Sequence, residues 1–181
     1  LKAHEYIPYV PIWFAKIFKE AGLPPGVFSV LQGLGPEVGS ALVSDHRIKF
    51  VSFTGSVKTG QAILRATADS FAKTQIEAGG KNSSVVCDDA DLERAVAITT
   101  QSGFVDAGQR CVQGSRIILF EKMYPKFKKM LLDRVSKLKV GAGENDDYGA
   151  IISEERMNAI LEAVDGAVSR GAKLLCGGNR L

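Results

Sequence analysis

The feature that most constrains this fold is an alternation of strand-like and helix-like segments joined by short connections. Short β-rich runs lie at residues 27–33, 48–53, 72–77, 82–89, 115–120 and 172–176. Segments with apolar side chains at helical spacing lie at residues 3–21, 36–45, 57–70, 91–105, 124–138 and 153–170. Such an alternation favours parallel strands connected by helical crossovers. The sequence therefore predicts an α/β fold of parallel sheets with flanking helices.

Two details refine this expectation. Gly79 and Gly80 offer the best point to divide the chain, which predicts one lobe over residues 1–79 and a second over residues 80–181. The first helix is expected to begin after Pro8 or Pro11, because proline is tolerated only in the first turn of a helix. Its Trp13 and Phe14 are expected on the core side.

Composition argues against several classes of function. The chain has 181 residues, 45% of them hydrophobic and 24% charged, as in ordinary globular proteins. The net charge is only +3 with dispersed basic residues, so we expect no nucleic-acid partner. No apolar run approaches the roughly 20 residues of a membrane span, and charges in the first turns argue against a signal peptide. We expect a cytoplasmic protein.

The cysteines and histidines predict neither a disulfide framework nor a metal site. There are three cysteines and two histidines, and no pair of cysteines has CxxC spacing. Cys87 and Cys176 are interpreted as packing residues. Cys111 allows two interpretations, a small hydrophobic core residue or a nucleophile whose thiolate is favoured by nearby N–H groups or cations.

Two further stretches allow both a structural and a functional interpretation. In FTGSVKTG, residues 53–60, a strand ends at a glycine and a helix follows. Gly55 and Ser56 either form a tight turn or receive a phosphate at the helix N-terminus. Glu77 ends the next strand before three small residues. It is either a solvated carboxylate or an ion-pair partner of Lys81, or it is a general base at the end of a strand.

The order of these motifs is similar to that of the aldehyde dehydrogenase superfamily. The shared stretches are KEAGLPPGVFSVLQG at 19–33, FTGS at 53–56, EAGGKN at 77–82, DADLERAV at 89–96, GQRC at 108–111 and GAKLLCGG at 171–178. The resemblance implies a partial Rossmann-like, NAD(P)-binding lobe over residues 1–79 and a partial catalytic lobe over residues 80–181. Family members are longer, and the chain resembles their middle portion.

The resemblance also assigns roles to individual residues. It implies that Cys111 attacks an aldehyde to give a thiohemiacetal, that hydride passes to NAD or NADP to leave a thioester, and that Glu77 activates the water releasing the acid. Gly55 and Ser56 would receive the pyrophosphate, and Ala78 and Gly79 would lie beside the nicotinamide. Ala78 departs from the leucine usual in the family.

The resemblance further implies a small aldehyde as substrate and self-association into a homo-oligomer. Two other functions stay open at this point. One is a catalytically incomplete fragment that serves as a binding or interaction module, and the other is a thiol esterase that uses Cys111 and Glu77 without a cofactor.

Overall fold

The computed structural model describes all residues, 1–181, and has the α/β architecture predicted from the sequence. The chain divides into two compact units, Leu1–Gly79 and Gly80–Leu181. Each contains a two-stranded parallel sheet, β1–β2 in the first unit and β3–β4 in the second. Each pair of parallel strands is connected through a helix, as the strand–helix alternation requires.

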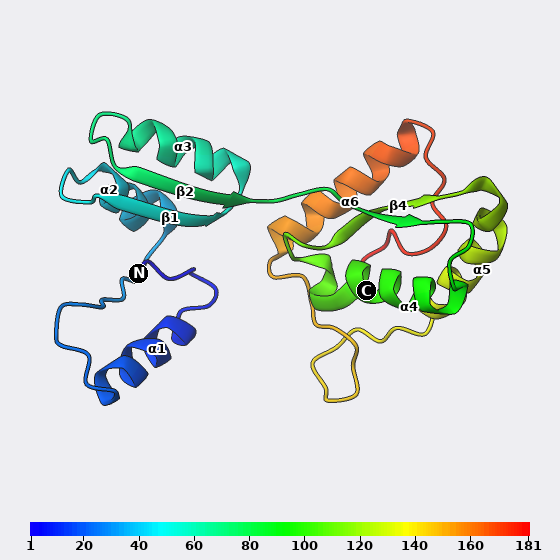
Figure 1. Cartoon of the computed structure of the whole chain (residues 1–181), viewed down its shortest axis with the longest axis horizontal. Helices are drawn as coiled ribbons and strands as arrows, with labels where there is room; N and C mark the ends of the chain where they lie inside the picture. Colours follow the sequence, from blue (N-terminus) through cyan, green and yellow to red (C-terminus); the bar gives the residue numbers. More distant parts are fainter. The chain divides into compact units, whose positions relative to one another are not determined.

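The first unit is built around strands β1 (Phe50–Gly55) and β2 (Lys73–Ala78) and the crossover helix α3 (Val57–Thr67). Figure 1 shows α3 running along one face of this sheet. The helix lies close to β2 because Gly60 has no side chain: a Cβ there would be 2.7 Å from Cγ2 of Ile76. Before β1 come a turn of π-helix, η1 (Gly35–Gly39), and the short helix α2 (Ser40–Ser44).

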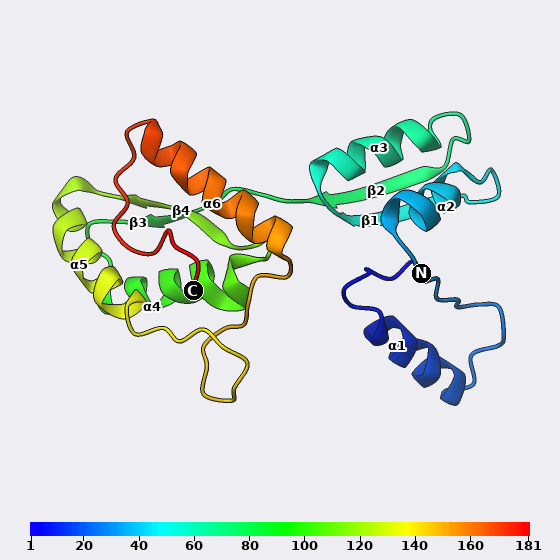
Figure 2. The same cartoon turned by 180° about the vertical axis from the view of Figure 1, so that it is seen from behind.

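Helix α1 (Tyr9–Glu20) begins directly after Pro8, as predicted, and holds Pro11 in its first turn. The expectation that Trp13 and Phe14 face a core is wrong, because they are 62% and 49% exposed. The helix has no buried residue, and Figure 2 shows it apart from the β1–β2 sheet. Its tertiary packing is limited to contacts such as the edge-to-face pair of Phe18 and Phe28, whose ring centroids are 5.0 Å apart.

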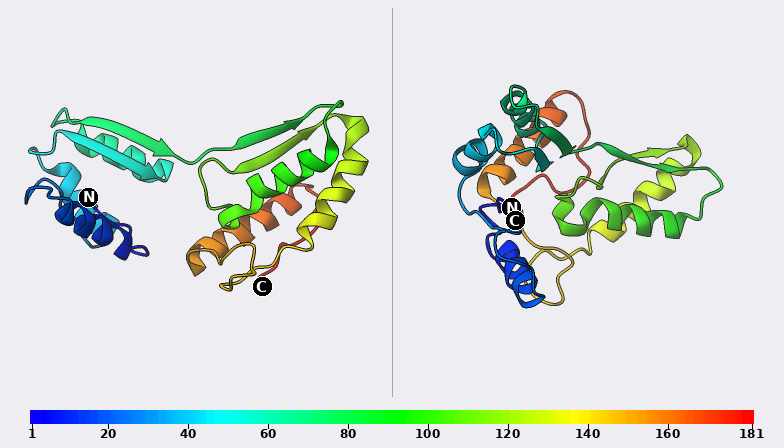
Figure 3. Two further views of the ribbon diagram at one scale, coloured as in Figure 1. Left: turned by 60° about the horizontal axis from the view of Figure 1, so that its bottom comes forward. Right: turned by 60° about the vertical axis from the view of Figure 1, so that its left-hand side comes forward.

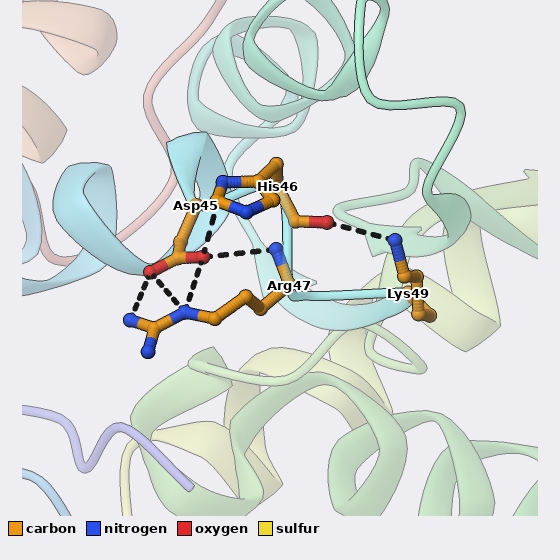
Figure 4. A network of polar contacts seen from close by, with 4 residues as sticks. All are labelled: Asp45, His46, Arg47 and Lys49. Carbon is orange, nitrogen blue, oxygen red and sulfur yellow. Dashed lines mark hydrogen bonds and ion pairs between the residues drawn. The ribbon is translucent and has the colours of Figure 1, made fainter.

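The turn that leads into β1 is fixed by an Asp–Arg pair (Figure 4). Nη2 of Arg47 lies 2.6 Å from Oδ2 of Asp45, whose Oδ1 also accepts from the Arg47 backbone N–H at 2.9 Å. Hydrogen bonds from the Arg47 side chain and then from its backbone hold the pKa of Asp45 well below its ordinary value. The same contact raises the pKa of Arg47.

The second unit contains a buried hydrophobic cluster formed by three of its elements. Strands β3 (Asn82–Val86) and β4 (Gly114–Leu119) pack against helices α4 (Leu92–Phe104) and α5 (Tyr124–Val135), as the left view of Figure 3 shows. Val86, Val96 and Phe127, one from each of β3, α4 and α5, form the buried cluster. Phe127 is only 1% exposed.

The remaining elements of this unit are short turns and one long helix. Two 3₁₀ turns, η2 (Val105–Gly108) and η3 (Glu121–Met123), precede β4 and α5 respectively. Helix α6 (Glu154–Ser169) has no buried residue, and the chain leaves it through Gly171 at a φ of 95°. A left-handed glycine directly after a helix is a common end signal.

Two predicted strands and two predicted packing residues are not found. Residues 27–33 form only an isolated bridge, between Leu31 and Lys2, and residues 172–176 form no strand. A β-rich run becomes a strand only where another strand pairs with it along its length. Cys87 and Cys176 are exposed rather than packed, because Cys87 follows the end of β3 and Cys176 lies in the unpaired segment.

Much apolar surface stays exposed. The accessible area is 13535 Å², whereas two separate compact units of these sizes would expose about 10,000 Å² together. None of the helices combines the length and the apolar character that crossing a bilayer requires.

Candidate functional site

The carboxyl ends of β1 and β2 bring several of the predicted site residues to one edge. In the parallel register Thr54 pairs with Glu77 and Gly55 with Ala78. The side chain of Glu77 is exposed and makes no hydrogen bond or ion pair within its unit. The carboxyl edge of a parallel sheet is the usual place for ligands in open α/β folds. Gly55, Glu77 and Ala78 therefore lie where such a site is expected.

Ser56 continues this edge into helix α3. Its side chain caps the helix, with Oγ accepting from the Thr59 N–H at 3.1 Å. The N–H groups of Val57 and Lys58, in the first turn, have no acceptor within the unit. These groups and the positive end of the helix dipole suit an anion.

Gly55 also has a packing role. A Cβ at this position would collide with the Phe53 ring, which folds over the glycine from two residues earlier on the same face of the strand. The missing side chain of Gly55 therefore makes room for the Phe53 ring.

Cys111 lies in the turn between η2 and β4, in the second unit, and is exposed. The core-cysteine interpretation is therefore wrong. The chain reaches the turn through three consecutive residues with positive φ, Asp106, Ala107 and Gly108, at 53°, 53° and 70°. Nε of the adjacent Arg110 lies 3.1 Å from Oδ2 of Asp106, so its charge is paired across the turn.

Side-chain amides fix the Cys111 turn on both sides. Neither amide was predicted from the sequence to have this role. Nδ2 of Asn82 donates to the carbonyl oxygens of Cys111 and Gln113 at 2.6 and 3.0 Å. Gln109 accepts from the Ile152 N–H at 2.9 Å and donates to the Ala150 carbonyl at 3.3 Å. The backbone N–H groups of Cys111 and Val112 have no acceptor within the unit.

The predicted site residues thus form two groups. Gly55, Ser56, Glu77 and Ala78 lie at the β1–β2 edge, followed by Gly79 at the end of the first unit. Cys111 lies in the second unit, among hydrogen bonds from β3 and from the segment before α6. The one sequence signal for the amides that hold the Cys111 turn was their place in the shared motifs: Asn82 belongs to EAGGKN and Gln109 to GQRC.

The chain matches the model of the aldehyde dehydrogenase family over residues 1–181. Among solved structures, it is 36% identical to betaine aldehyde dehydrogenase from Staphylococcus aureus in complex with NAD+, with a TM-score of 0.96 over 99% of this chain. HpcC from Thermus thermophilus is also 36% identical, with a TM-score of 0.96 over 100% of this chain. An NAD-dependent aldehyde dehydrogenase from Sinorhizobium meliloti is 34% identical, with a TM-score of 0.97 over 100% of this chain.

The chain spans only 36% of the length of each of these three proteins. The family model and the Sinorhizobium meliloti structure each match the whole of this chain. The chain belongs to the aldehyde dehydrogenase family.

Proposed function

We propose that this chain carries the nucleophile and the general base of an NAD-dependent oxidation of an aldehyde to a carboxylic acid. The observation that carries the proposal is the placement of Cys111: an exposed thiol in a turn whose own N–H has no acceptor within its unit. Family membership over residues 1–181 and the NAD+ bound to the Staphylococcus aureus relative support the same reaction.

The proposed nucleophilic step uses Cys111. Its thiolate sulfur adds to the aldehyde carbonyl carbon, and the carbonyl oxygen becomes an oxyanion on the resulting adduct. The free Cys111 N–H is a suitable donor to that oxyanion, because a preorganised N–H stabilises charge that develops in the transition state. The adduct then has a carbon from which hydride can depart, which leaves a thioester on Cys111.

The residues at the β1–β2 edge fit a dinucleotide. Ser56 and the free N–H groups of Val57 and Lys58 would hold the pyrophosphate, and Ala78 and Gly79 would lie beside the nicotinamide. NAD would supply the hydride acceptor. The NAD+ of the S. aureus relative favours NAD over NADP in the proposal.

Glu77 is proposed as the general base for release of the product. Its carboxylate takes a proton from water, the water oxygen attacks the thioester carbon, and the carboxylic acid leaves with the thiolate restored. The absence of any ion pair to Glu77 within its unit leaves both carboxylate oxygens available for this water.

The test measures reduced cofactor by absorbance after mixing the chain with NAD+ and a panel of aliphatic and aromatic aldehydes. We expect Cys111→Ala to abolish turnover and Cys176→Ala, which removes another exposed thiol, to leave it unchanged. Turnover that survives Cys111→Ala would refute the nucleophile. A folded wild-type chain without turnover would favour the second interpretation, a catalytically incomplete module of the family.

Self-association into a homo-oligomer stays a prediction. It is supported by the two-stranded β1–β2 sheet, which has strand edges to pair, and by the exposed aromatic side chains of α1. Sedimentation velocity across a concentration series is the measurement, and a single monomeric species at all concentrations would contradict the prediction.

A further inference from the structure

Of the two side-chain amides that hold the Cys111 turn, that of Asn82 bonds directly to the Cys111 carbonyl, and it has no role in the chemistry proposed above. Asn82 begins β3 and pairs with Gly114, the first residue of β4, at an irregularity in the strand register. Its NH₂ group donates to two carbonyls, those of Cys111 and Gln113. One amide therefore binds the first and the last of the three peptide units between Cys111 and Gly114, where β4 begins.

The position of Asn82 is itself fixed by its neighbours. The guanidinium of Arg116 on β4 donates twice to the Lys81 carbonyl, at 2.5 and 3.1 Å, directly before Asn82. The amide is thus presented to the turn by the sheet rather than by a mobile loop.

The hydrogen bond from Asn82 to the Cys111 carbonyl also sets the direction of the Val112 N–H. In a trans peptide the C=O and the following N–H point in opposite directions, and the chain has no cis peptide. With the Cys111 oxygen held toward Asn82, the Val112 N–H points away from it, and it has no acceptor within the unit. The Gln113 peptide is held at both ends, because the Gly114 N–H donates to Oγ of Ser102 at 3.1 Å.

We propose that Asn82 is a positioning residue for Cys111: its amide holds the Cys111 and Gln113 carbonyls so that the Val112 N–H, next to the thiol-bearing residue, stays free to meet an acyl oxygen. The hydrogen-bonding part of this inference stands on the second unit alone. Its consequence for acyl transfer rests on the function proposed for Cys111.

The test compares three variants of the 181-residue chain. Asn82→Asp keeps the shape and removes both donors, and Asn82→Gln keeps the donors on a longer side chain. Asn158→Asp, on the exposed face of α6, makes the same chemical change at an asparagine without a side-chain hydrogen bond. Thermal unfolding followed by circular dichroism checks that each variant is folded.

Three readouts separate positioning from stability. Amide exchange reports on the Gln113 and Gly114 N–H groups. Acetyl transfer from p-nitrophenyl acetate to the Cys111 sulfur, with p-nitrophenolate as leaving group, is followed by the mass of the Cys111 peptide. Alkylation by iodoacetamide, measured relative to Cys176 in the same molecule, reports on access to the thiol without an oxyanion to stabilise.

For Asn82→Asp we expect exchange at Gln113 and Gly114 to quicken by about tenfold and acetylation to slow by about tenfold, because two hydrogen bonds are lost. Alkylation should change by less than about threefold, since that reaction develops no oxyanion. Asn82→Gln should recover part of the acetylation rate, and Asn158→Asp should behave as wild type.

Unchanged exchange and acetylation in Asn82→Asp would overturn the inference, as would an equal fall in acetylation, alkylation and melting temperature, which indicates a purely structural role. If the wild-type Cys111 peptide gains no acetyl group at all, the proposed function fails instead. The exchange readout still decides the hydrogen-bonding role in that case: quickened exchange upholds it and unchanged exchange refutes it.

Discussion

The two units hold their candidate chemical residues by different means. Glu77 is placed by backbone pairing, because the parallel ladder of β1 and β2 sets it opposite Thr54. Cys111 lies outside any ladder and is placed by a few side chains, chiefly Asn82 and Gln109. The two residues belong to one proposed reaction, yet they depend on different parts of the sequence.

The two positions therefore differ in how sensitive they are to side-chain substitutions. A strand end keeps its place through most side-chain substitutions, since main-chain hydrogen bonds set the register. A turn fixed by side-chain amides loses its geometry with one substitution. The buried cluster belongs to the second unit, which also contains the Cys111 turn. In the first unit, Ala3 and Ile63 are the only buried hydrophobic residues.

The largest expected effect is that of Phe127→Ala in the second unit. Phe127 is 1% exposed and packs with Val86 and Val96, so the variant should lose about 3–5 kcal/mol of unfolding free energy. Denaturant unfolding with amide exchange resolved by residue measures it. Exchange in β2, in the other unit, should stay as in wild type, and equal loss in both units would contradict their independence.

A smaller effect is expected where α3 meets β2. In Gly60→Ala the new Cβ would lie 2.7 Å from Cγ2 of Ile76, and this overpacking should cost about 1–2 kcal/mol after the helix-propensity gain. Chemical denaturation gives the value.

Gly166→Ala in α6 is the matched control for this substitution. Its Cβ would meet only the flexible end of Arg170, at 3.3 Å, so we expect a gain of about 0.5–1 kcal/mol. A Gly60→Ala protein as stable as wild type would show that the close approach of helix and strand is not needed.

The helix caps should give nearly equal effects in the two units. Ser56 accepts from the Thr59 N–H and Asp91 from the Arg94 N–H, each at 3.1 Å. Ser56→Ala and Asp91→Ala should each lose about 1 kcal/mol. Exchange at Thr59 and Arg94 is the direct measurement. A much larger effect at Ser56 would indicate that the β1–β2 edge depends on its cap more than on strand pairing.

The smallest expected effect is a pH dependence at the Asp45 turn. Because the pKa of Asp45 is lowered from 3.8, the folded turn is favoured above that pH, and this preference is lost as pH falls through the lowered value. Arg47→Gln should return the pKa toward 3.8, since the Arg47 side chain is its main cause. NMR titration of the Asp45 carboxyl measures it. Lys49→Gln, which alters a bond to the His46 carbonyl, should leave it unchanged.

Most helices and the central strands were predictable because their signals are local. Pro8 fixes the start of α1, Ser56 and Asp91 cap α3 and α4 through their own third-next N–H groups, and Gly171 follows the end of α6. Each of these signals acts within a few residues, so the sequence alone contains it.

The missed features depend on residues far apart in the chain. The β-rich runs 27–33 and 172–176 lack a pairing strand, which no local pattern reveals. Asn82 bonds to a carbonyl 29 residues later, and only the pairing of β3 with β4 shows that the two meet. The candidate site was predictable as a set of motifs, but the groups that hold Cys111 in place were not.

The parallel pairing described for each unit also has a kinetic consequence. Each sheet joins two strands that follow one another directly in the sequence, with a single crossover helix closing the loop in the first unit. Contacts between nearby segments form faster than contacts between distant ones, because less chain entropy is lost before they form. We therefore expect the β1–β2 and β3–β4 sheets to order as separate early events, and the Cys111 turn to become ordered only after Asn82 has taken its place in β3.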